Sequence, residues 1–195
     1  MNNNCFIEFT VTNTHTTTDY CISKVMTMLH GIMRKTETNI GVSFPEMESY
    51  HLGNKIRLFG SSEQLMLILS DQQIKDACRR SLCSLSVYFP TPVPSNGKLV
   101  SYQADRNQSH NIMSSFNSKL TRYEKRHNEK MPLDDQRKLK LNLVKKSKKL
   151  PFFMINSTNK TYSLYITKTS KEQNENTFVF NSHGLGNLGG CVYDF

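Results

Sequence analysis

Proline at alternate positions, in the segment Pro90-Thr-Pro-Val-Pro94, most constrains how this chain of 195 residues can fold. Proline fixes its own backbone torsion φ and has no amide hydrogen to donate, so we expect no regular helix or strand to run through the segment. We predict a stiff, extended linker instead. The chain then divides into one domain of residues 1–94 and a second of residues 95–195.

Upstream of the prolines, strand-like and helix-like patterns follow one another in the order β-α-β-β-α-β. The predicted strands cover residues 5–11, 40–44, 55–59 and 82–89. Thr18 or Asp19 is expected to cap one helix, in which apolar residues recur every three or four positions, and the capping-box pair Ser61 and Gln64 is expected to start a second. This order is that of the ferredoxin-like split unit and predicts an α+β fold. Residues 72–80 either extend the second helix or form a third.

Downstream of the prolines, we predict a smaller α/β domain. Its strands are expected at residues 99–104, 152–155, 161–166 and 177–180, and a helix at about residues 109–130. Pro132 ends the helical pattern. The chain finishes in the glycine-rich segment His183-Gly-Leu-Gly-Asn-Leu-Gly-Gly190. The segment contains a GxGxxG pattern, but we expect no dinucleotide site because that site needs a helix after the glycines.

Positive charge is concentrated in the second predicted domain. Residues 119–149 hold 12 of the 25 Lys and Arg residues and four acidic residues, a net charge of +8 against +9 for the whole chain. Like charges at this density repel one another unless a polyanion neutralises them, and nucleic acid is the expected polyanion. A solvated basic helix or a disordered tail is the alternative.

Other features of the sequence exclude several classes of protein. No run of about 18 apolar residues is present, so we expect no contact with a membrane. The first residues do not form a signal peptide, and the five cysteines form no CxxC pair, which favours a cytoplasmic protein with reduced thiols. No cluster of carboxylates suits a two-metal nuclease, so we expect neither a metal nor a cofactor.

Two histidines are candidates for chemistry. His30 follows the apolar Leu29 near the end of the first predicted helix, where a structural histidine is the alternative, and His183 adjoins the glycine-rich segment. Imidazole is the side chain best suited to move protons near neutral pH. If the protein cuts RNA without a metal, the RNA 2′-hydroxyl is the nucleophile and the protein supplies a base, an acid and orientation.

These segments together resemble one family, the CRISPR repeat-processing endoribonucleases of type I-F systems. The resemblance rests on Leu29-His30, Ile40-Gly-Val-Ser-Phe-Pro45, Leu150-Pro-Phe152 and the segment 180–190. It implies a ferredoxin-like domain and a smaller domain whose basic helix lies in the major groove of the repeat hairpin. It also implies cleavage at the hairpin base by the 2′-hydroxyl, which leaves a 2′,3′-cyclic phosphate and a 5′-hydroxyl. The enzyme is expected to stay on the crRNA and to join the other subunits of the interference complex.

The resemblance also assigns residues. His30 matches the catalytic histidine, Ser157 the serine that holds the attacking ribose, and Tyr162 the aromatic residue that stacks under the last base pair. Arg106 and Gln108 match the pair that reads purine edges, although Gln103 competes with Gln108 for that role. The phosphate contacts are expected to be Lys119, Arg122, Lys125 and Arg126.

Two departures from the family pattern are visible. The groove helix mixes lysine with arginine, and lysine is a poorer bidentate ligand, so the hairpin is expected to be held less specifically. His183 stands where the family has a tyrosine, and we hypothesise that His30 and His183 share the base and acid roles. Two alternatives stay open: an RNA-hairpin-binding subunit that does not cut, and a basic RNA- or DNA-binding protein of the ribosomal type.

Overall fold

The computed structural model describes residues 5–12, 16–105, 112–146, 150–156, 161–172 and 178–195. The chain forms two compact units, one made of residues 1–104 and 150–195 and the other of residues 105–149. Each unit is described by itself below. The domain boundary predicted at residue 94 concerns folding domains and stays a prediction.

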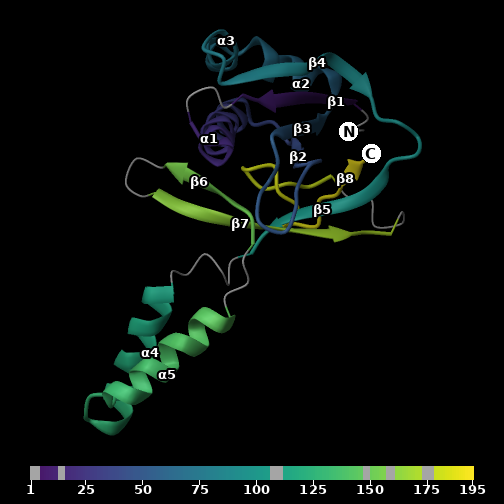
Figure 1. Ribbon diagram of the computed structural model, residues 1–195. Coiled ribbons are helices and arrows are strands. Elements are labelled where there is room, and N and C mark those ends of the chain that lie inside the picture. Colours follow the sequence, from purple (N-terminus) through teal and green to yellow (C-terminus); the bar gives the residue numbers. More distant parts are fainter. Residues whose placement is uncertain (1–4, 13–15, 106–111, 147–149, 157–160, 173–177) are drawn as a thin grey trace. The chain divides into compact units, whose positions relative to one another are not determined.

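The first half of the chain contains the predicted order of elements. These are β1 (Cys5–Val11), α1 (Thr18–Thr36), β2 (Gly41–Ser43), β3 (Lys55–Gly60), α2 (Ser62–Ser70), α3 (Gln72–Arg79) and β4 (Cys83–Pro92). The strands form an antiparallel sheet in the order β2-β3-β1-β4 (Figure 1). The capping box of Ser61 and Gln64 is present at the start of α2, and α3 is a separate helix that Asp71 caps. The α+β class predicted from the sequence is confirmed.

The predicted break at the prolines is wrong for Pro90 and Pro92. Strand β4 runs through both of them, and Cys5 and Phe6 of β1 pair with Pro92 and Thr91. The reason is the position of β4, which lies at the edge of the sheet and, among the described strands, pairs only with β1. Proline is tolerated on an edge strand, because there its missing amide hydrogen leaves no partner unsatisfied.

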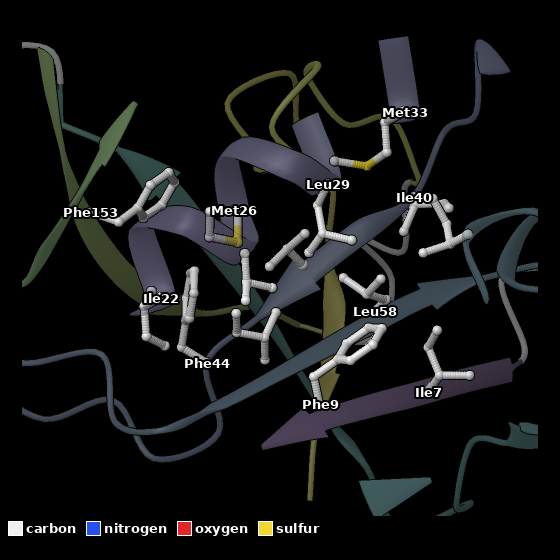
Figure 2. Packing of buried hydrophobic residues seen from close by; sticks show 14 of the residues in the cluster. Ile7, Phe9, Ile22, Met26, Leu29, Met33, Ile40, Phe44, Leu58 and Phe153 are labelled. Carbon is white, nitrogen blue, oxygen red and sulfur yellow. The ribbon is translucent and has the colours of Figure 1, made fainter. Parts of the chain in front are cut away.

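Helix α1 provides much of the core. Its buried apolar side chains recur at helical spacing and face the sheet, where Phe9 and Leu58 are also fully buried. Figure 2 shows Ile22, Met26 and Leu29 of α1 among these residues. Burying an aliphatic or aromatic side chain stabilises a fold by roughly 1.5–3 kcal/mol, so this contact fixes the position of α1.

A second antiparallel sheet belongs to the same compact unit. It consists of β5 (Lys98–Ala104), β6 (Phe152–Asn156), β7 (Thr161–Ser170) and β8 (Val192–Asp194), in the order β6-β7-β5-β8. Phe153 of β6 and Tyr102 of β5 are buried in the common core, and the Tyr102 hydroxyl donates to the Phe44 carbonyl at 3.0 Å. The core therefore links the two sheets.

The last predicted strand, residues 177–180, is wrong for the part that the structure describes. Residues 178–180 form no strand and pair with no strand in the described ranges. The Asn39 side chain takes its place, because its amide nitrogen donates to the Phe178 carbonyl and its oxygen accepts from the Phe180 amide. The sequence reading missed β8, which pairs with β5.

A buried charge cluster fixes the end of the chain against the first sheet. Arg57 of β3 donates to the Glu8 carboxylate at 2.7 and 3.0 Å and to the Phe195 backbone oxygen at 3.1 Å. The Arg57 guanidinium also lies 4.0 Å from the centre of the Phe195 ring. The charge of Arg57 is therefore paired with a carboxylate, and each of its three nitrogens donates a hydrogen bond, as a buried charge requires.

The second compact unit contains two helices, α4 (Ile112–His127) and α5 (Leu133–Lys146). The sequence reading predicted α4 but not α5. Helix α4 ends at His127, five residues before Pro132, and Asn128 just beyond it has a left-handed φ of +55°. Pro132 directly precedes α5, and its carbonyl accepts a hydrogen bond from the Gln136 amide at 3.0 Å. Proline suits this place, because the amides at the start and in the first turn of a helix have no partner within it. Asp134 and Asp135 in that turn favour the helix dipole. None of the helices in the described ranges is long and apolar enough to cross a membrane.

Candidate functional site

His30 and His183, far apart in the sequence, lie in contact in the structure. Their rings are stacked, with centroids 4.0 Å apart and 23° between the ring planes. His30 lies on α1, next to the buried Leu29 that anchors this turn in the core. His183 lies in the loop that follows Phe180. The structure thus brings together the two histidines that the sequence reading selected.

A hydrogen bond orients the His30 ring. Its Nδ1 atom lies 2.6 Å from the Ser182 carbonyl oxygen. A carbonyl only accepts hydrogen bonds, so Nδ1 carries the hydrogen in this contact. In the neutral ring, the lone pair is then on Nε2, the atom that is free to act as a base.

The surroundings of His183 favour its neutral form. Burial, the charge of His30 and the charge of Arg34, in that order, lower the pKa of His183 to about 4. Its Nδ1 atom is buried and has no hydrogen-bond partner among the residues that the structure describes. An exposed imidazole takes up a proton when the pH falls below its usual pKa of 6.5. At this buried position, a charged His183 ring would lose its hydration without gaining a hydrogen-bond partner, so the neutral form is favoured.

Two asparagines hold the loop that carries His183. The Asn181 side-chain oxygen accepts from the backbone amides of His183 at 2.8 Å and Leu185 at 3.1 Å. Its amide nitrogen donates to the Asn187 oxygen at 3.2 Å. Asn187 in turn accepts from the Ala104 amide at 2.9 Å and donates to the Ala104 carbonyl at 3.0 Å. The Asn187 side chain therefore replaces a strand residue at the end of β5.

The sequence reading missed both asparagines. Their signal is local, because asparagine next to glycine is typical of turns in which the side chain bonds the backbone. Gly184 shows why the loop needs glycine: its φ is +73°, and a side chain there would collide with Val42 and with the Ile40 carbonyl oxygen. The loop thus lies directly on the strand β2 that follows α1.

On the side of the site away from the glycine-rich loop, α1 contacts the edge strand β6. The Ser23 hydroxyl accepts from the Met154 amide at 2.9 Å, and the Thr27 hydroxyl lies 3.5 Å from the Met154 carbonyl oxygen, to which it donates. Strand β6 ends at Asn156, immediately before Ser157. These contacts fix the strand that leads to Ser157 relative to the helix that carries His30.

The remaining predicted site residues differ in what the structure says of them. Ser157, Arg106 and Gln108 lie outside the described residues. Tyr162, on β7, is 39% exposed and pairs with Ile155. The Gln103 amide donates to the Ser101 hydroxyl at 3.3 Å and to the Gly186 carbonyl at 3.4 Å, so this competitor of Gln108 is used within the fold.

The predicted phosphate contacts lie on α4. All four side chains are exposed, and their spacing of three and four residues places them along one side of the helix. They are Lys119, Arg122, Lys125 and Arg126. Within the described residues, no group of three or more histidine, cysteine, aspartate and glutamate side chains is arranged to hold a metal ion.

Comparison with known proteins adds the family. A family model described as CRISPR-associated protein (Cas_Csy4) matches residues 6–192, nearly the whole chain. No curated protein matches the chain. The match confirms the resemblance found in the sequence, and it covers the elements that carry both histidines. The chain therefore belongs to the Cas_Csy4 family of CRISPR-associated proteins, the RNA-binding nucleases that process CRISPR repeats.

Proposed function

We propose that this protein is a metal-independent endoribonuclease that recognises the sequence and structure of the repeat hairpin in precursor crRNA and cuts it. The stacked pair of His30 and His183, with His30 Nδ1 held by the Ser182 carbonyl, carries the proposal. After cutting, the protein stays on the 3′ stem-loop of the crRNA and joins the other subunits of the type I-F interference complex.

The proposed reaction is an internal transfer of the phosphate. His30 Nε2 takes the proton of the 2′-hydroxyl, the 2′-oxygen attacks the adjacent phosphorus, and the bond from phosphorus to the 5′-oxygen breaks. The 5′-oxygen takes up a proton, which leaves a 2′,3′-cyclic phosphate and a 5′-hydroxyl. Ser157 holds the attacking ribose and Tyr162 stacks under the last base pair of the stem. Because the nucleophile belongs to the substrate, orientation supplies much of the rate.

His183 is proposed to give the proton to the leaving 5′-oxygen. In the free protein its pKa of about 4 is too low for that role at neutral pH. The causes, largest first, are burial, the charge that His30 carries once it is protonated, and the charge of Arg34; an RNA phosphate in the site opposes the effect of those charges. Binding of RNA is therefore expected to raise the pKa of His183 toward the range in which it can donate.

Replacing His183 with phenylalanine tests both the lowered pKa of this residue and its proposed role in proton transfer. In the parent, the unfolded chain binds a proton at His183 below pH 6.5 while the folded chain binds it only near pH 4, so stability is lost as the pH falls between these values. Between pH 7 and pH 5 we expect the parent to lose about 2 kcal/mol more unfolding free energy than the variant. Urea denaturation at the two pH values measures this difference.

The same variant is informative in cleavage. With saturating hairpin RNA, we expect it to cut about 10²-fold more slowly than the parent and to lose one limb of a bell-shaped pH–rate profile. The hypothesis that His183 takes part in proton transfer is excluded if the variant cuts at the parental rate across the pH range. In the urea experiment, an equal loss of unfolding free energy by parent and variant between pH 7 and pH 5 would contradict a buried, neutral His183.

Recognition is proposed to divide between two sets of residues. Arg106 and Gln108 read purine edges in the major groove, since arginine pairs with guanine and glutamine with adenine through two hydrogen bonds each. The exposed cations of α4 contact phosphates, which gives affinity but little sequence preference. The lysines among them make single rather than forked contacts.

A cleavage assay in EDTA tests the proposed function. The substrates are the cognate repeat hairpin and the same RNA with one 2′-deoxy residue at the scissile position. We expect only the first to be cut, because only it carries the nucleophile, and we expect the product to end in a 2′,3′-cyclic phosphate. Tight binding of both RNAs with neither cut would show a hairpin-holding subunit. Cutting of both would exclude attack by the 2′-hydroxyl.

A further inference from the structure

One flank of α1 carries His30 and the two residues that bond strand β6. Ser23, Thr27, His30 and Arg34 follow one another at intervals of four, three and four residues, so they share a flank of the helix. The first two bond the backbone of Met154 on β6, and His30 contacts Ser182 and His183. Arg34 is the next residue on this flank, one turn beyond His30.

The C-terminal loop passes this last turn of α1. Asn39, just after the helix, bonds the backbone of Phe178 and Phe180, while His30, nine residues before Asn39, bonds Ser182. The segment from residue 178 to residue 183 therefore runs along the turn that carries Arg34. The positive charge of Arg34 reaches His183, where it contributes to lowering the pKa of the imidazole.

The Arg34 side chain is exposed, and no ion pair among the described residues includes it. Glu37, the nearest acidic residue along the chain, lies beyond the end of α1 as its C-cap. A guanidinium group that faces a reaction site without a carboxylate partner is free to bind an anion. Its planar fork matches two phosphate oxygens at once.

We propose that Arg34 is a further catalytic residue, whose guanidinium binds the non-bridging oxygens of the scissile phosphate. The proposal rests on the proposed endoribonuclease function. As the 2′-oxygen attacks, negative charge builds on these oxygens, and a fixed cation stabilises this state more than the ground state. The bonds that form and break are those of the proposed reaction, and Arg34 transfers no proton.

The neighbouring Lys35 provides a matched control. It has the same charge, is also exposed and lies in the same last turn, where both cations favour the helix dipole. It is rotated about 100° around the helix from Arg34, away from the flank of His30. A general effect of charge or of helix stability would therefore appear in both variants, whereas contact with the reacting phosphate would appear only at Arg34.

The experiment compares Arg34→Gln, Arg34→Lys and Lys35→Gln in the full-length protein. Single-turnover cleavage of saturating hairpin gives the rate of the chemical step, and the uncleavable 2′-deoxy hairpin gives Kd at fixed salt. We expect Arg34→Gln to slow the chemical step by about 10²-fold while Kd changes only a few-fold. Arg34→Lys should recover part of the rate, and Lys35→Gln should match the parent in both measurements.

Titration of His183 by NMR in the free protein locates Arg34 without any cleavage. Arg34→Gln should raise the pKa of His183 because it removes a neighbouring positive charge, and Lys35→Gln should change it less. An unchanged His183 in Arg34→Gln would place Arg34 away from the site and overturn the inference.

The outcomes in cleavage are also separable. If the parent cuts in EDTA and Arg34→Gln cuts as fast at saturation, the inference fails and the proposed function stands. The inference also fails if Arg34→Gln weakens only Kd, or if Lys35→Gln loses the same rate. If the parent itself does not cut the hairpin, the proposed function fails first.

Discussion

His30→Ala is expected to slow cleavage of the repeat hairpin by about 10³-fold while leaving its affinity for the hairpin close to that of the parent. The substitution removes the proposed base, the Nε2 atom of the imidazole that the hydrogen bond to the Ser182 carbonyl orients. It leaves α1 intact, because the buried anchor of this turn is Leu29 and alanine is a good helix former. Single-turnover rates with the hairpin, and Kd with its 2′-deoxy form, measure the two quantities.

Two controls separate loss of a base from loss of structure. His51→Ala removes a surface histidine whose only ion pair in the described residues is with Glu48, at 3.1 Å, and should cut normally. Free imidazole added to His30→Ala should restore part of the rate, since it supplies the missing base to the vacated space. If His30→Ala cuts the hairpin at the rate of the parent, His30 is not the base and the proposed mechanism is wrong.

Neutralising the four cations of α4 is expected to have the largest effect on binding. The variant carries Lys119→Gln, Arg122→Gln, Lys125→Gln and Arg126→Gln. Each phosphate contact contributes about 0.7–0.9 to the slope of log affinity against log salt, so the slope should become shallower by about three units. We also expect affinity to fall by about 10²-fold or more at physiological salt. Titrations at several salt concentrations, with the uncleavable hairpin, measure both.

Helix α5 supplies the matched control in the same compact unit. Arg137 and Lys138 lie within 3.8 and 3.9 Å of Asp134 and Asp135, so neutralising them with Lys140 removes cations that are mostly paired already. This triple glutamine variant should bind almost as the parent does. Equal losses from both helices would mean that the basic unit attracts RNA only through its total charge, without a defined contact surface on α4.

The sequence reading could predict the features that depend on neighbouring residues. The capping box at Ser61, the apolar face of α1 and the class of the fold all follow from spacing. His30 and His183 were each selected from their own surroundings. Their contact arises only when the C-terminal loop lies along α1, and nothing local to either histidine encodes it. The sequence predicted a shared site only through the family resemblance, in which His183 takes the place of a tyrosine.

Three elements were mispredicted for the same physical reason. Pro90 and Pro92 are compatible with a strand only because β4 is at the edge of the sheet. A strand was predicted over residues 177–180, but over residues 178–180 the backbone bonds the Asn39 side chain instead of a neighbouring strand. Helix α5 has few buried apolar residues, so its pattern is weak in the sequence. In each case the local structure depends on contacts with residues distant in the chain, which the local sequence pattern does not reveal.

Two hydrogen bonds join the Asn187 side chain to the backbone of Ala104, so the Ala104 amide reports on the loop that carries His183. The Ala104 hydrogen is protected from exchange with solvent by a side chain of the very loop that carries His183, and not by a neighbouring strand. Its exchange rate therefore measures how often that loop opens. Ala104 also lies opposite Ile166 of β7, a pairing that does not depend on the loop. Exchange of this one amide therefore separates opening of the His183 loop from unfolding of the sheet beneath it.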